Sequence, residues 1–112
     1  MMKQEVVIGI DIGGTSSKIG VVDQLGEVLA YRSFSSYAQD SFDRFLKTLE
    51  DQIALLKKDV EHEVTYRAVG TGAPDINSRT GCMVHPPNFK WGDEVPLLHA
   101  IKSLLNLPGV VS

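Results

Sequence analysis

The first 35 residues contain three strand patterns joined by turns that are too short to hold a crossover helix. The strand patterns cover residues 5–10, 17–22 and 27–35, and the first two are rich in β-branched side chains. The segments between them, residues 11–15 and 23–26, contain the Gly and Asp residues that are typical of tight turns. Consecutive strands joined by such short turns pair antiparallel. The chain therefore opens with an antiparallel meander, which limits the fold more than any other feature of the sequence.

Apolar residues with a helical period follow the meander and predict an amphipathic helix from Asp40 to about Val60. The residues expected on its buried face are Phe42, Phe45, Leu46, Leu49, Ile53, Leu56 and Val60. Asp40 or Ser41 can cap the start of the helix by accepting a hydrogen bond from its first turn. A strand pattern follows at residues 64–71, and we expect Val64, Tyr66, Ala68 and Gly70 on one side of it.

The remaining residues predict a long loop, a second helix and a last strand. Residues 72–93 are rich in Gly, Pro and Asn, with a hairpin expected at residues 78–81, and a loop of this length is typical of a binding function. A helix is expected over Val95–Leu105, with Pro96 in its first turn, and an apolar strand begins at Pro108. Helical crossovers join parallel strands. The sequence thus predicts an α/β fold with one mixed sheet, in the order strand, strand, strand, helix, strand, helix, strand.

Composition restricts the class of protein. A chain of 112 residues has room for one domain with a moderate core. The net charge of -3 argues against nucleic acid as a partner, since such binders carry a clustered basic face. Cys82 has no cysteine with which to form an intrachain disulfide. Because no apolar run approaches the roughly 18 residues of a membrane span and no signal-peptide core follows the first residues, we expect a cytoplasmic protein without a membrane partner.

The segment from Gly9 to Lys18 is the strongest candidate for a ligand site. Gly13 and Gly14 at a hairpin tip can adopt positive φ and approach a ligand closely. Their amides and that of Thr15 can converge on phosphate oxygens, with the Lys18 charge nearby. Asp11 can orient a hydrated Mg²⁺. The same spacing also fits an ordinary tight hairpin, so spacing alone leaves both interpretations open.

Two other phosphate-binding loops are excluded. A P-loop requires Lys directly after its second spaced Gly, and Thr15 stands there instead. A dinucleotide fingerprint has spaced glycines that open a helix, whereas Gly13 and Gly14 are adjacent and precede a strand pattern. The remaining loop residues favour structural roles. Trp91 is expected to anchor the loop, and the pair Cys82 and His85 provides too few ligands for a zinc site.

The motif Asp-x-Gly-Gly-Thr-x-x-Lys at residues 11–18 resembles the first phosphate motif of the ROK family, within the actin-like sugar kinase superfamily. Further segments resemble the same family in the same order: Gly70–Pro74, Thr80–Gly81, Pro87–Phe89, Trp91, Val95–Leu97 and Leu107–Pro108. The resemblance covers nearly the whole chain. One departure is Asp75, where the family often has Gly, and we interpret it as an exposed turn residue.

The resemblance implies a ribonuclease H-like (actin-like ATPase) domain and a role in sugar phosphorylation. Residues 1–112 would be the amino-terminal phosphate- and sugar-binding domain of a two-domain, ATP- and Mg²⁺-dependent hexose kinase, such as one that converts glucose to glucose 6-phosphate. By position, Gly72 and Asn88 would contact sugar hydroxyls, although an Asn in a Pro-rich loop can instead cap that loop. The catalytic base is expected directly after Ser112, so this fragment should contain no catalytic residue and be inactive.

Two alternatives belong to other functional classes. One is a ROK-type sugar-responsive transcriptional regulator, and the absence of a helix-turn-helix before residue 11 argues against it. The other is a non-kinase actin-like ATPase, against which the sugar-side loop at Pro87 and Asn88 argues. Because the second domain is absent, apolar surface should be exposed and favour homo-oligomers.

Overall fold

Two sheets and two helices make up residues 3–112, the part of the chain that the computed structural model describes. The strands of the main sheet are β1 (Gln4–Ile12), β2 (Ser16–Asp23), β3 (Val28–Ser35), β4 (Val64–Gly72) and β8 (Gly109–Val111). The strands of a small sheet are β5 (Ile76–Asn77), β6 (Cys82–Val84) and β7 (Glu94–Val95). The helices are α1 (Phe42–Asp59) and α2 (Leu97–Leu105), and neither is long and apolar enough to cross a membrane.

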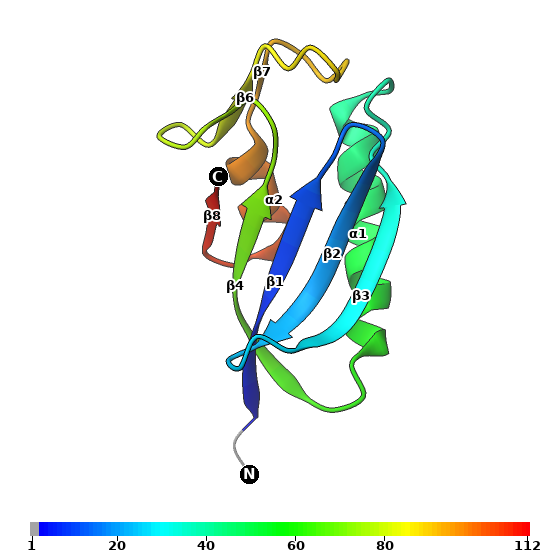
Figure 1. Ribbon diagram of the computed structural model, residues 1–112, viewed down its shortest axis with the longest axis vertical. Coiled ribbons are helices and arrows are strands. Elements are labelled where there is room, and N and C mark those ends of the chain that lie inside the picture. The colour runs from blue at the N-terminus through cyan, green and yellow to red at the C-terminus, as the bar shows by residue number, and fades with distance from the viewer. Residues whose placement is uncertain (1–2) are drawn as a thin grey trace.

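The main sheet has the strand order β3-β2-β1-β4-β8 and is mixed, as predicted (Figure 1). β1, β2 and β3 pair antiparallel through short turns. β4 and β8 are each reached through a helix, and they extend the sheet in parallel with β1. At the centre, Ile10 lies opposite Ile19 on one side and Thr71 on the other. The predicted order of strands and helices is therefore confirmed for the main sheet, and the small sheet adds three short strands between β4 and α2.

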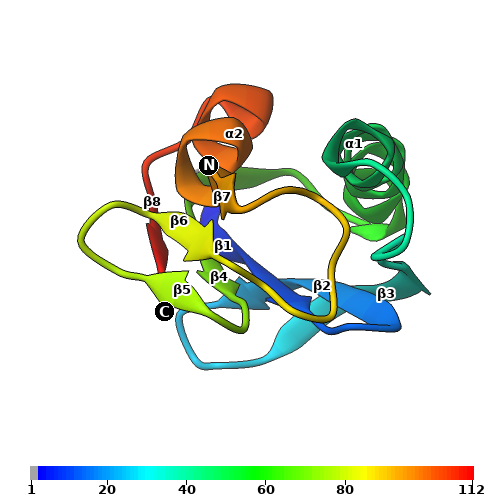
Figure 2. The ribbon, with the colours of Figure 1, turned by 90° about the horizontal axis from the view of Figure 1, so that it is seen from above.

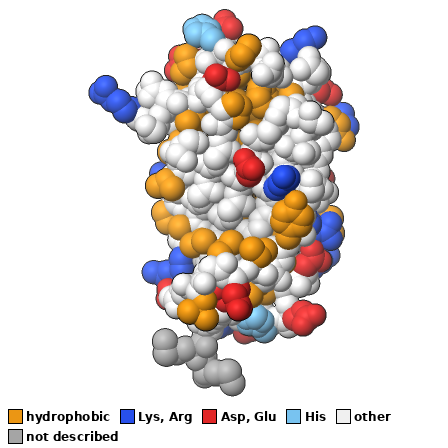
Figure 3. Space-filling model, viewed as in Figure 1, with side chains coloured by type: hydrophobic (Ala, Val, Ile, Leu, Met, Phe, Trp, Pro, Cys, Tyr) orange, Lys and Arg blue, Asp and Glu red, His pale blue; other side chains and the backbone are white. Residues whose placement is uncertain are grey.

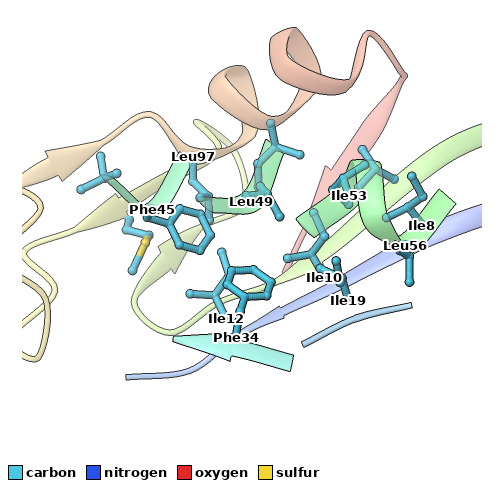
Figure 4. Close-up of a cluster of buried hydrophobic side chains, with 14 of the residues drawn as sticks. Ile8, Ile10, Ile12, Ile19, Phe34, Phe45, Leu49, Ile53, Leu56 and Leu97 are labelled. Atoms are coloured by element: carbon cyan, nitrogen blue, oxygen red, sulfur yellow. The ribbon is translucent and has the colours of Figure 1, made fainter. Parts of the chain in front are cut away.

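Side chains of the sheet and the helices meet in one apolar core (Figure 4). Ser41 caps α1, because its hydroxyl accepts a hydrogen bond from the Arg44 amide at 3.1 Å. The helical period then turns the predicted apolar face toward the sheet. Its fully buried members are Phe45, Leu49, Ile53 and Leu56, while Phe42, Leu46 and Val60 are half-buried at the edges. From α2, Leu97 and Ile101 are fully buried in the same core.

A bulge in β4 makes one prediction wrong. Val64 and Tyr66 contact the core as expected, but farther along the strand the core-facing residues are Val69 and Thr71 and not Ala68 and Gly70. The reason is a register shift against β1: Val6 pairs with Tyr66 and Val7 with Ala68, which leaves one extra residue in β4. Because side chains alternate between faces, one extra residue reverses the remainder of a strand.

The predicted start of the second helix is also corrected. Val95 belongs to β7, where it pairs with Met83 and is buried, so it is a strand residue of the small sheet. Pro96 is the N-cap of α2, and the helix begins at Leu97. Proline fixes its own φ and lacks an amide hydrogen, which suits the boundary between a strand and a helix. The hairpin expected at residues 78–81 is present and joins β5 to β6.

Both helices pack on the same face of the main sheet, and the other face is uncovered in the described part of the chain (Figure 2). Small residues occupy its middle, where Gly9 lies between Gly20 and Gly70 on the neighbouring strands. Figure 3 shows this face as a broad area of backbone and small polar groups, with an acidic and a basic side chain next to each other. Large apolar side chains, including Tyr31 and Val28, are also exposed on it.

Candidate functional site

The turn between β1 and β2 is closed by Gly13. Its amide donates a hydrogen bond to the Ser16 carbonyl at 3.0 Å, so this amide is engaged within the turn. A Cβ atom at this position would lie 2.7 Å from the same oxygen, a distance that backbone atoms do not tolerate. Contrary to prediction, neither Gly13 nor Gly14 has a positive φ. The fold requires glycine at position 13 because of this close backbone approach.

Gly14 and Thr15 form the exposed tip of the turn. A Cβ atom on Gly14 would meet nothing within 4 Å, so packing within the chain does not require glycine there. Among residues 3–112, neither the Gly14 amide nor the Thr15 amide donates a hydrogen bond. Two adjacent amides without partners, at a site without side-chain obstruction, can donate to the oxygens of an anion.

Charged side chains lie beside this turn on the uncovered face of the sheet. Asp11 pairs in register with Lys18 on β2 and with Gly72 on β4, so the three residues form a row across three strands. Asp11 and Lys18 are exposed, and neither forms an ion pair within 4 Å in residues 3–112. A Cβ atom on Gly72 would lie 3.9 Å from the Asp11 carboxylate, which leaves that flank of Asp11 open.

The donor set around Asp11 fits Mg²⁺ better than a metal held by protein alone. In the described residues, no group of three or more His, Cys, Asp or Glu side chains is arranged to hold a metal ion. Mg²⁺ keeps several waters and is commonly held by one or two carboxylates together with substrate phosphates. One open carboxylate beside two free amides matches that requirement. Cys82 and His85 are not part of such a group.

A cleft of about 570 Å³ adjoins the tip of the turn. Gly14 and Thr15 line one side, and Ser35 together with residues 37–40, from the connection between β3 and α1, lines the other. In Figure 1 this connection, the glycine turn and the loop after β6 all lie at the same end of the molecule. The cleft therefore lies at the end of the sheet where the loops gather.

The loop that carries Asn88 is tied to the same connection. The Asn88 carbonyl accepts a hydrogen bond from Gln39 Nε2 at 3.1 Å, and the Asn88 side chain is exposed. The Trp91 indole donates to the Tyr37 carbonyl at 3.1 Å and packs against Phe45 at a centroid distance of 4.7 Å. The expectation that Trp91 anchors this loop is confirmed. The connection between β3 and α1 thus contacts the loop of Asn88 and also lines the cleft opposite Gly14.

Sequence reasoning missed Ser36, Tyr37 and Gln39, which join these segments. Their partners lie 19 or more positions away in the chain, as with Ser36 and Ser17, or Gln39 and Asn88. No local pattern marks a serine after a strand or a glutamine before a helix as a link between two loops. Only the packing of the loops against each other reveals it.

Comparison with known proteins points to one family. Residues 7–112 match the ROK family. A glucokinase from Streptomyces coelicolor is 32% identical over 109 residues, which cover 95% of this chain and 32% of that protein. The crystal structure of a ROK family glucokinase from Streptomyces griseus, in complex with glucose and AMPPNP, superposes with a TM-score of 0.74 at 27% identity, over 96% of this chain and 32% of that chain.

A structure of another functional class has a similar fold. A ROK family transcriptional regulator, described as a homologue of the E. coli MLC protein, superposes with a TM-score of 0.81 at 18% identity. The alignment covers 97% of this chain and 28% of the regulator. The chain spans about a third of the length of the curated relatives it matches.

Proposed function

Because the chain belongs to the ROK family, we propose that it is the phosphate- and sugar-binding domain of an ATP-dependent sugar kinase. Its fold is the ribonuclease H-like fold of the actin-like ATPases. The catalytic base and the adenosine site are proposed to lie in a second domain or adjoining segment, outside residues 1–112. The substrate class is a hexose, with glucose as the first candidate because the relatives that match are glucokinases.

The observation that supports this proposal most is the pair of unpartnered amides at Gly14 and Thr15 beside the exposed Asp11 carboxylate. In the proposed complex the two amides and the Thr15 hydroxyl donate to phosphate oxygens of ATP, and Lys18 adds a positive charge nearby. Gly13 forms the turn and contributes no free amide. Asp11 would hold Mg²⁺ through water, and that ion would neutralise charge on the phosphates.

The proposed sugar side consists of Gly72 and Asn88. Gly72 is a register neighbour of Asp11, so a sugar hydroxyl near Gly72 would lie beside the phosphate end of the site. The exposed Asn88 amide can both donate to and accept from a hydroxyl. Transfer between two bound substrates of this kind depends on their positioning and on charge stabilisation, with little covalent chemistry for the protein.

Full-length protein carrying this domain should transfer the γ-phosphoryl group of ATP to a hexose. The test is a panel of hexoses with Mg²⁺ and ATP, in which both ADP release and the sugar phosphate are measured. Sugar-dependent ADP release with a stoichiometric sugar phosphate is the expected result. ATP hydrolysis that does not depend on sugar would indicate a non-kinase ATPase. Sugar binding without any turnover would favour the regulator class, whose fold is similar.

Two adjacent glycines allow phosphate binding to be separated from folding. Gly14→Ala should leave the melting temperature within a few degrees, since its Cβ meets nothing and alanine restricts the unfolded chain. It should raise the KM for ATP about tenfold, because the added methyl group occupies the space of the phosphate. Gly13→Ala should lower the melting temperature markedly, since its Cβ would lie 2.7 Å from the Ser16 oxygen. An unchanged KM for ATP in Gly14→Ala would contradict the phosphate role.

A further inference from the structure

Ser36 holds the glycine turn from the inside. It follows β3 directly and is fully buried. Its hydroxyl donates a hydrogen bond to the Gly13 carbonyl at 2.6 Å, and its amide donates to the Thr15 carbonyl at 3.1 Å. One residue thus binds the carbonyls on both sides of Gly14. No other side chain in the described residues forms a hydrogen bond with this turn tip.

The hydrogen atoms in this cluster can be assigned. A carbonyl only accepts, so the single hydroxyl hydrogen of Ser36 goes to Gly13. The 2.7 Å contact between the hydroxyls of Ser36 and Ser17 must then be donated by Ser17. Both serines are fully buried, so water does not compete for these bonds. Ser17 therefore supports Ser36 without touching the turn carbonyls itself.

The bond to the Gly13 carbonyl determines where the Gly14 amide points. Carbonyl and N–H of one trans peptide point in opposite directions. Because Ser36 draws the Gly13 oxygen inward, the Gly14 amide hydrogen points outward, toward the exposed side of the turn. The peptide lies between two glycines and lacks the Cβ atoms that normally restrict backbone rotation. Without the hydrogen bond from the Ser36 hydroxyl, the Gly13–Gly14 peptide can rotate and present its carbonyl oxygen to an approaching anion.

We propose that Ser36 is a positioning residue for phosphate binding, which fixes the Gly13–Gly14 peptide so that the Gly14 amide donates to a phosphate oxygen of a Mg²⁺–nucleoside triphosphate. This inference rests on the proposed function of the same turn. The residue acts through Gly14 and does not contact the nucleotide. Loss of the Ser36 hydroxyl should therefore weaken nucleotide binding more than sugar binding.

Ser36→Ala and Ser17→Ala form a matched pair for the test in full-length protein. Each removes one member of the same buried hydroxyl pair, so both should lower the melting temperature, and Ser36→Ala should lower it more because it also loses the bond to Gly13. Only Ser36→Ala leaves the Gly13 carbonyl without its donor. We expect it to raise the KM for Mg·ATP about tenfold and that for the sugar less than about twofold. Ser17→Ala should change the KM for Mg·ATP less than about threefold. Equal KM values for Mg·ATP in the two variants would overturn the proposal.

A second measurement covers the case in which Ser36→Ala does not fold. In wild-type protein labelled with ¹⁵N, Mg·AMPPNP should shift the Gly14 amide resonance, and an unmoved Gly14 resonance at saturation overturns the proposal. If the protein phosphorylates a hexose while Gly14 does not respond, the positioning role fails and the kinase function stands. If Gly14 responds but no hexose is phosphorylated, the kinase function fails, while the contact between Gly14 and the nucleotide on which the positioning role depends stands.

Discussion

Asp11→Ala in full-length protein should lower kcat for sugar phosphorylation by about 10³-fold or more, since it removes the carboxylate proposed to hold, through water, the magnesium ion that neutralises the transferring phosphate. The fold should be unaffected. Asp11 is exposed and makes no ion pair in residues 3–112, so its truncation removes no buried contact. The measurement is steady-state kinetics with saturating ATP and sugar, together with circular dichroism of the purified variant.

Two further substitutions sharpen this test. Asp11→Asn keeps the shape but removes the charge, and it should lose most of the activity that Asp11→Ala loses. Glu5→Ala serves as the matched control, because Glu5 is also an exposed carboxylate on β1 and lies toward the other end of the strand. Its one ion pair within residues 3–112, with Arg67, is long at 3.9 Å and exposed. Near-wild-type activity in Asp11→Ala, or equal losses in Asp11→Ala and Glu5→Ala, would refute the metal role.

Phe45→Ala should reduce the free energy of unfolding by about 3–5 kcal/mol, the usual cost of truncating a buried aromatic side chain. Phe45 is fully buried and packs against Phe34, Phe42 and Trp91, with centroid distances of 6.3, 6.1 and 4.7 Å. For a domain of about this size, such a loss lowers the melting temperature by roughly 15–25 °C. Trp91 is the single tryptophan of the chain, so its fluorescence during urea unfolding reports the change directly.

Phe42→Ala is the control for this stability prediction. Phe42 belongs to the same aromatic cluster, at 5.3 Å from Trp91, but it is only half-buried at the edge of the core. Its truncation should cost about 1–2 kcal/mol, because less apolar surface returns to water. Equal losses for Phe42→Ala and Phe45→Ala would mean that the described core does not hold α1 against the sheet.

Much of the fold follows from local patterns in the sequence. The short turns near Gly13 and Gly26 require antiparallel neighbours, and the observed pairing of β1, β2 and β3 agrees. The spacing of Phe45, Leu49 and Leu56 places them on one face of α1, and the structure buries all three. These features depend on residues close together in the chain, so periodicity and turn chemistry suffice to predict them.

Features that depend on distant partners escaped prediction. The bulge in β4 arises from pairing with β1 about 60 positions earlier, and no local pattern distinguishes Ala68 from Val69 as the core-facing residue. Val95 continues the small sheet because Met83 lies opposite it. The need for glycine at position 13 comes from the Ser16 carbonyl and not from φ. The sequence pointed to the turn at Gly13 and Gly14 as the candidate site, which stays a prediction, but it gave no sign of Ser36, whose hydroxyl donates to that turn.

The hydrogen bonds around residues 36–39 have a consequence for ligand choice. Ser36 binds the glycine turn, and Gln39 and Ala38 bind the loop at Asn88 and Lys90, so short backbone links join the two loops. Residues 36–39 therefore set the distance between the two loops in this structure. A molecule that contacts both loops must match this distance. Selection between longer and shorter substrates would then depend on the spacing of the loops as well as on side chains that recognise chemical groups.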